Sequence, residues 1–105
     1  MIYTVQLTEQ AKQDLRGIYE YIAMSLLSPE TAKNLVRRIV AALRSLQEMP
    51  NRYSVYQEEP WKSRGLRRIN IENFSGFYFV EEDAVQVIRI MYSCRDISNV
   101  LNESD

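Results

Sequence analysis

Residues 61–96 decide the fold, and they read WKSRGLRRINIENFSGFYFVEEDAVQVIRIMYSCRD. The stretch begins with a basic cluster, residues 62–68, which holds four cations and no acid. Three strand-like runs follow: Leu66–Asn73, Gly76–Glu81 and Ala84–Tyr92. We expect tight turns near Ser75-Gly76 and at Glu82-Asp83, so the three runs should form an antiparallel meander.

Arginines stand at both ends of this predicted sheet, in the basic cluster and at Arg95 just after the last strand. The planar guanidinium binds phosphate or carboxylate bidentately and stays charged. The arrangement could therefore hold several cations around one anionic partner. The same residues also suit a solvated sheet edge, where basic side chains discourage strand-to-strand aggregation. The pattern alone leaves both interpretations open.

The composition indicates one globular domain. With 105 residues, 46% of them apolar, the chain is long enough for one compact core and too short for two ordinary ones, so we expect a single domain over residues 1–105. The first residues do not resemble a signal peptide, and no apolar run approaches the roughly 20 residues that cross a bilayer. We therefore expect a cytoplasmic protein without membrane contact.

Several chemistries are excluded because the chain has no histidine and a single cysteine. Neither a Ser-His-Asp nor a Cys-His nucleophile can be built, and one cysteine cannot form a structural zinc site. We expect no metal and no cofactor. Cys94 is expected to be an inert packed residue, because a lone cysteine without a nearby histidine base rarely does chemistry.

Two amphipathic helices are predicted in the first half of the chain. Thr8 suits the N-cap of the first, which should carry its apolar stripe as far as Leu26. Ser28 and Pro29 suit the cap and first position of the second, which should end before Pro50. Because only two or three residues separate the helices, they should form an antiparallel hairpin.

The predicted order is β-α-α-β-β-β, an α+β fold. An N-terminal strand, residues 2–7, precedes the helix hairpin, the meander follows it, and a short helical turn closes the chain near residues 96–101. The hairpin should cover one face of a four-stranded sheet and leave the other concave and partly open. The run 84–92 is apolar on both sides, which is typical of a central strand. Trp61, in the irregular segment 50–61, is expected to be buried and structural.

At this point the chain resembles the RelE/ParE superfamily, the toxins of type II toxin–antitoxin modules. The resemblance covers nearly the whole length. Its most specific segments are Gly65-Leu66-Arg67-Arg68, then Phe77-Tyr78-Phe79-Val80, then Ile88-Arg89-Ile90-Met91-Tyr92-Ser93-Cys94-Arg95-Asp96. The last segment is similar to the closing signature of the family, although Tyr92 stands where many relatives have histidine.

The resemblance implies two activities of different class. RelE-like members are ribosome-dependent endoribonucleases that cut mRNA, and ParE-like members bind and inhibit DNA gyrase without chemistry of their own. Our first expectation is mRNA cleavage, and gyrase inhibition or a non-toxic partner-binding role are the alternatives. RNA cleavage needs a group that activates the 2′-hydroxyl, cations that stabilise the phosphorane and an acid for the leaving oxygen.

The resemblance also suggests which residues carry each role. The expected catalytic residues supply three cations and one phenol, and they are Arg95, Arg68, Arg67 and Tyr92. The expected RNA-binding residues, all cationic, are Lys62, Arg64 and Arg89. The chain departs from the RelE-like pattern where Asn70 replaces a lysine and where Leu101 replaces the usual late tyrosine.

A cognate antitoxin is the partner that the resemblance implies, together with mRNA on the ribosome or, alternatively, DNA gyrase. Antitoxins are partly disordered proteins that wrap the toxin by adding a helix or strand. We expect contacts on the open sheet face and on residues 53–61. A homodimer and a toxin–antitoxin hetero-oligomer are both compatible with the sequence.

Overall fold

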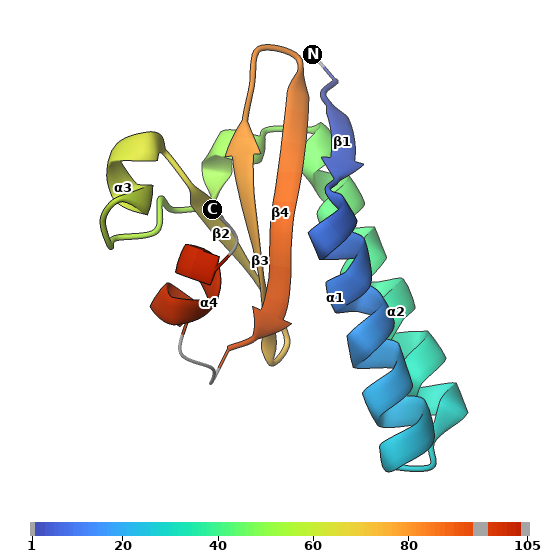
Figure 1. Cartoon of the computed structure of the whole chain (residues 1–105). Helices are drawn as coiled ribbons and strands as arrows, with labels where there is room; N and C mark the ends of the chain where they lie inside the picture. The colour runs from blue at the N-terminus through green and yellow to red at the C-terminus, as the bar shows by residue number, and fades with distance from the viewer. Residues whose placement is uncertain (1, 94–96, 104–105) are drawn as a thin grey trace.

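The computed structural model describes residues 2–93 and 97–103, and it has the predicted α+β order (Figure 1). The strands are β1 (Thr4–Leu7), β2 (Arg67–Ile71), β3 (Phe74–Val80) and β4 (Ala84–Tyr92). The helices are α1 (Glu9–Glu20), α2 (Pro29–Arg44), α3 (Trp61–Arg64) and α4 (Ile97–Glu103). Short helical turns extend α1 (η1, Tyr21–Ser25) and α2 (η2, Ser45–Gln47), and a third lies in the following loop (η3, Pro50–Arg52).

The four strands form one sheet in the order β1-β4-β3-β2. Strand β1 pairs in parallel with β4, and the other neighbours pair antiparallel. Strand β4 is therefore central, as its two-sided apolar pattern predicts. The first and last strands of the chain lie side by side, with Thr4 opposite Ala84 and Leu7 opposite Val87.

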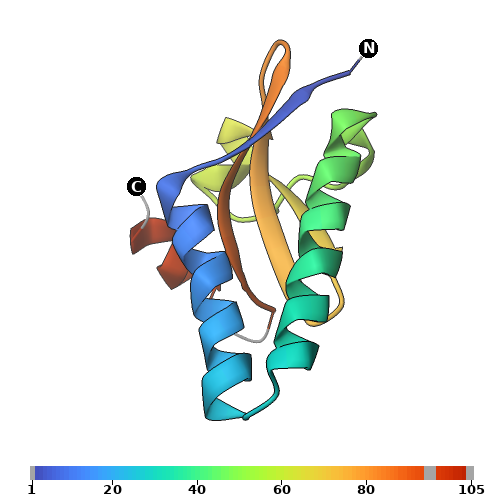
Figure 2. The ribbon, with the colours of Figure 1, turned by 90° about the vertical axis from the view of Figure 1, so that its right-hand side faces the viewer.

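The helix hairpin covers one face of the sheet (Figure 2). Helix α1 begins at the predicted cap, because the hydroxyl oxygen of Thr8 accepts a hydrogen bond of 3.2 Å from the backbone N–H of Ala11. Pro29 is the first residue of α2, also as predicted. The side chains that fill the space between hairpin and sheet are Ala11, Leu35, Ile39, Leu43, Leu46, Ile69, Ile71, Tyr78, Val85, Val87 and Ile90.

The other face of the sheet, which was predicted to be concave and partly open, is partly covered. Helices α3 and α4 lie over it (Figure 1). A second buried cluster forms there from Trp61, Leu66, Phe77, Met91, Val100 and Leu101. Trp61 is 2% exposed, so the prediction that it is buried is confirmed. Its indole N–H has no hydrogen-bond partner among the described residues, so its contribution comes from packing.

The first turn of the meander lies three residues earlier than predicted. The chain reverses at Glu72-Asn73, where Glu72 adopts a positive φ of 55°, and Ser75 and Gly76 lie inside β3. Gly76 is needed for close packing: a Cβ there would lie 3.1 Å from Cδ2 of Leu43 and 3.2 Å from Cγ2 of Ile69. The prediction was wrong because glycine was interpreted as a turn residue.

No helix in the described part of the chain is both long and apolar enough to span a membrane.

Candidate functional site

Arg67 is used to fasten a loop to the edge of the sheet. Its guanidinium donates a hydrogen bond of 3.1 Å to the carbonyl oxygen of Asn51 and a second to the carbonyl oxygen of Tyr53. The backbone of Val55 also bridges to Arg67, which covers the outer edge of β2. These two hydrogen bonds hold residues 51–55 against the sheet, and they use donors of the guanidinium that could otherwise bind a ligand.

Arg68 belongs to a polar network on β2 and β3. Its Nε donates to Oδ1 of Asn70 at 3.1 Å and to Oγ of Ser75 at 3.0 Å, and Oγ of Ser93 lies 2.9 Å from Oγ of Ser75. Arg68 and Arg52 both line an open pocket of about 620 Å³ against residues 53–58. Of the predicted catalytic cations that the structure describes, Arg68 is the one that faces a pocket.

Arg89 forms an ion pair with Asp14 of α1. Its Nε lies 2.8 Å from Oδ2 and a terminal nitrogen 3.1 Å from Oδ1, which is the bidentate fork that arginine favours. The two side chains are 14% and 16% exposed. Asp14 also accepts from the backbone N–H of Ile90 at 2.9 Å, and Arg89 donates to the carbonyl of Val100 at 3.4 Å. The pair therefore joins α1, β4 and α4.

Of the predicted site residues that the structure describes, Lys62, Arg64, Arg67, Arg89 and Tyr92 do not line the pocket of Arg68. Arg64 lies over the rings of Trp61 and Phe79, with centroid distances of 4.8 and 5.5 Å. Lys62 is exposed on α3. Tyr92 lies at the end of β4, packed edge-on against Phe74. Arg95 lies outside the described residues, together with Cys94 and Asp96. The roles assigned to these residues stay predictions.

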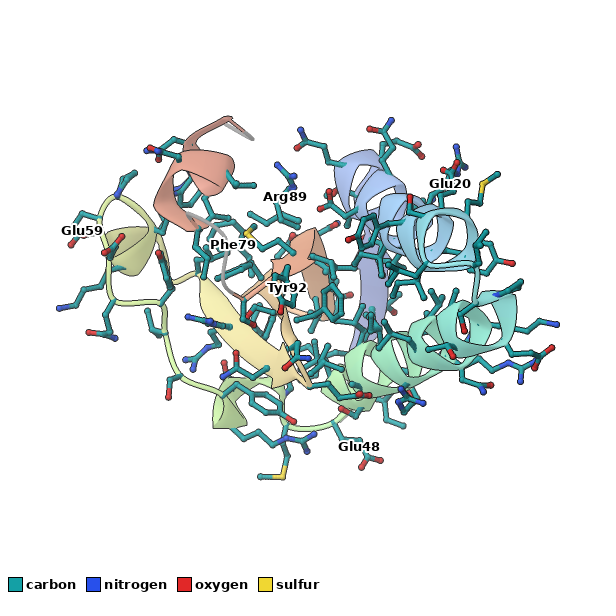
Figure 3. The ribbon with its side chains drawn as sticks, turned by 90° about the horizontal axis from the view of Figure 1, so that it is seen from below. Glu20, Glu48, Glu59, Phe79, Arg89 and Tyr92 are labelled. Carbon is teal, nitrogen blue, oxygen red and sulfur yellow. The ribbon has the colours of Figure 1, made fainter. Side chains whose placement is uncertain are left out.

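A second opening lies between the helix hairpin and the end of the sheet. This groove has a volume of about 850 Å³, and its walls come from α1, η1, α2, the 72–73 turn, β3 and β4. Apolar side chains dominate it: Ile18, Tyr21, Ile22, Leu26, Leu35, Phe74, Ile90, Met91 and Tyr92. Figure 3 shows the sheet end at Tyr92 facing the hairpin that carries Glu20. A volume of this size suits several apolar side chains of a partner.

The end of the hairpin continues this apolar surface into solvent. Tyr21, Met24, Leu26 and Leu27 are 61%, 70%, 57% and 83% exposed. We call this set the hairpin tip. Leu27 also adopts a positive φ of 53°, which costs a non-glycine residue roughly 1–2 kcal/mol. A strained backbone that displays a large apolar side chain to water is destabilising for the free chain, and such strain is typical of binding surfaces.

The described residues offer little for metal or covalent chemistry. Among them, no cluster of cysteine, aspartate and glutamate could hold a metal ion. The one phenol with a resolved shift is Tyr78, where burial raises the pKa to about 12. Its hydroxyl donates to the carbonyl oxygen of Pro50 at 2.6 Å, so it acts as a neutral structural donor.

Sequence reasoning missed two functional features of this region. The ion pair of Arg89 depends on Asp14, which is 75 residues earlier in the chain and looks like an ordinary helix-surface acid. The hairpin tip did leave a signal, because Met24, Leu26 and Leu27 extend the apolar residues beyond the width of one helix stripe.

The fold, a helix hairpin packed on a four-stranded sheet with β4 at its centre, is that of the toxins of type II toxin–antitoxin systems. The chain belongs to the family of ParE toxins of type II toxin–antitoxin systems, whose model matches residues 5–97. A solved structure of the chromosomal ParDE system from P. aeruginosa is similar, with 29% identity, a TM-score of 0.73 and coverage of 87% of this chain and 96% of that one.

More distant structures share the fold. The RelBE2 complex from Mycobacterium tuberculosis is 18% identical with a TM-score of 0.59, and covers 88% of this chain and 99% of that one. The archaeal RelE–RelB complex from Pyrococcus horikoshii is 17% identical with a TM-score of 0.60, and covers 90% and 99%. No curated protein sequence is significantly similar to the chain. The prediction of a RelE/ParE superfamily toxin is confirmed.

Proposed function

We propose that this toxin acts by binding DNA gyrase and inhibiting it, and that a cognate antitoxin neutralises it. The observation that carries the proposal is the contrast between an open apolar groove of about 850 Å³ and two predicted site arginines of the sheet that are already paired. Arg67 binds two backbone carbonyls and Arg89 binds Asp14. Inhibition by binding needs a protein-sized contact surface and no proton transfer.

The groove and the hairpin tip supply that surface in this proposal. Exposed apolar patches on a small protein mark interaction sites, and anchors such as Tyr21 and Leu27 provide most of the affinity at such sites. We assign this surface to gyrase. An antitoxin segment that covers it would exclude gyrase, because one surface cannot hold two partners at once.

RNA cleavage is the second candidate, because Arg52 and Arg68 line one pocket. The phosphate of an RNA strand would find two cations there. In that pocket the hydroxyl of Tyr56 donates to the carboxylate of Glu58 at 3.2 Å, so this phenol and this acid are paired with each other. The lining acid is Glu58 and the lining phenols are Tyr53 and Tyr56. We therefore reverse the order of the two expectations from sequence.

The experiment compares both activities with the same purified chain. We expect it to block negative supercoiling by gyrase, to be relieved by the antitoxin, and to leave mRNA 5′ ends unchanged on induction. Leu27→Asn should weaken gyrase inhibition, while Arg68→Gln, matched as a single surface change, should keep it. New in-frame mRNA cuts that disappear in Arg68→Gln, with supercoiling unaffected, would reverse the assignment.

A further inference from the structure

The outer face of α2 carries a line of cations that the proposed function does not use. Lys33, Arg37 and Arg44 are all exposed. None of the three forms a hydrogen bond or ion pair within the described residues, whereas the neighbouring Arg38 pairs with Glu72. We call Lys33, Arg37 and Arg44 the α2 cations.

Helix geometry places the α2 cations on one line. At 100° per residue, positions 33, 37 and 44 fall within about 40° of each other. They span 11 residues, or about 16 Å along the axis at 1.5 Å per residue. The buried residues of the helix, which are Ala32, Leu35, Ile39 and Leu43, lie on the opposite side. Glu30, one turn before Lys33, is the acid in the first turn of the helix.

The residues around the α2 cations indicate which type of partner this face of the helix could bind. A protein interface has an apolar or aromatic centre with a polar rim. The exposed residues between the α2 cations are Asn34, Arg38 and Ala41, and none of them is a large apolar or aromatic anchor. A cationic face without an apolar centre is the type of surface that contacts a phosphate backbone, where charge supplies most of the affinity.

We infer that the α2 cations contact the phosphate backbone of duplex DNA. The inference extends the proposed function, because gyrase holds DNA and a toxin bound to gyrase lies near that duplex. The groove lies on the sheet side of the hairpin and the α2 cations on the solvent side, so both could be occupied at once. We expect the contact to be independent of base sequence, because phosphate contacts carry no sequence information.

The test measures binding of the purified chain to a fluorescent 20-base-pair DNA duplex by anisotropy, across a salt series. Three phosphate contacts predict a slope of about −2.7 in log K against log salt, or about 40-fold weaker binding at 200 mM than at 50 mM. Arg37→Gln with Arg44→Gln should reduce the slope to about −1 and weaken binding at least tenfold at 50 mM salt. Lys12→Gln with Arg16→Gln on α1 removes the same charge and should leave the slope near that of the wild type.

Four outcomes would overturn the inference. These are no binding at 50 mM salt, equal losses in both double variants, tighter binding to an RNA duplex of equal length, or equal binding to poly-glutamate, which would indicate an acidic protein partner. Circular dichroism and the melting temperature show whether each variant is folded. A supercoiling assay on the wild type separates the two proposals, because gyrase inhibition can fail while DNA binding holds, and the reverse.

Discussion

The sheet and helix α2 carry the same type of cation in different surroundings. The sheet arginines are Arg67 and Arg89, and the helix arginines are Arg37 and Arg44. The sheet arginines are held by two carbonyl groups and by Asp14, so they stabilise the fold. The helix arginines have no partner within the described residues and face solvent. A count of cations along the sequence therefore says little about which of them bind a ligand, because local geometry decides which are already neutralised.

The strongest test of this contrast is Asp14→Ala. The change leaves Arg89 largely buried without its counter-ion and removes the acceptor of the Ile90 N–H. We expect a loss of about 3–5 kcal/mol in the free energy of unfolding, measured by urea denaturation. Glu20→Ala, an exposed acid on the same helix, should change it by less than about 0.5 kcal/mol. Equal effects would show that Arg89 is not a structural cation.

Leu27→Asn separates binding from stability at the hairpin tip. Asparagine tolerates a positive φ and removes exposed apolar surface. We expect gyrase affinity to fall about 10- to 100-fold, while unfolding free energy stays equal or rises by up to about 1 kcal/mol. Surface plasmon resonance and thermal melts measure the two quantities. A variant that loses stability and keeps affinity would make Leu27 part of the core.

Tyr78→Phe tests a buried polar contact of the sheet. It removes the hydrogen bond to the carbonyl oxygen of Pro50, and we expect a loss of about 1–2 kcal/mol at pH 7. Because burial raises the pKa of Tyr78 to about 12, the folded state keeps its proton longer than the unfolded state. The wild type should therefore lose stability as the pH rises from about 10 to 12, and Tyr78→Phe should lose less over that range. Parallel pH curves would contradict the assignment.

The smallest effect is expected for the pair of Arg38 and Glu72, which joins α2 to the β2–β3 turn. The hydrogen bond from Arg38 lowers the pKa of Glu72, but both side chains are about half exposed and the pair is screened by solvent. Arg38→Gln should change the urea midpoint by no more than the measurement error, in both low and high salt. A clear loss of stability at low salt would show that this pair, like that of Arg89 and Asp14, stabilises the fold.

Much of the fold was predictable because it depends on local patterns. The apolar stripes gave both helices, Thr8 and Pro29 gave their starts, and the two-sided apolar run gave the central strand. The place of the first turn was not predictable, because Gly76 lies inside β3 and is needed for the close approach of Leu43 from a distant helix. The covering of the second sheet face by Leu101 likewise depends on contacts far along the chain.

The candidate site was less predictable than the fold. The sequence predicted Arg67 as a catalytic residue and Arg89 as an RNA-binding residue. Their partners are the carbonyl of Asn51 and the carboxylate of Asp14, which no sequence spacing connects to them. Arg68 is the predicted catalytic cation that does face a pocket. Family resemblance gave the class of protein, and only the arrangement of side chains separates a binding surface from a catalytic one.

The parallel pairing of β1 with β4 has a consequence for how the toxin appears during synthesis. Strand β1 leaves the ribosome first, yet its neighbours are residues 84–87, which are made almost at the end. A hairpin of α1 and α2 can form earlier, but the β3 and β4 walls of the groove do not yet exist. An incomplete chain therefore lacks the complete groove. An mRNA truncated before codon 84 would yield apolar fragments that are open to proteolysis, and no complete toxin.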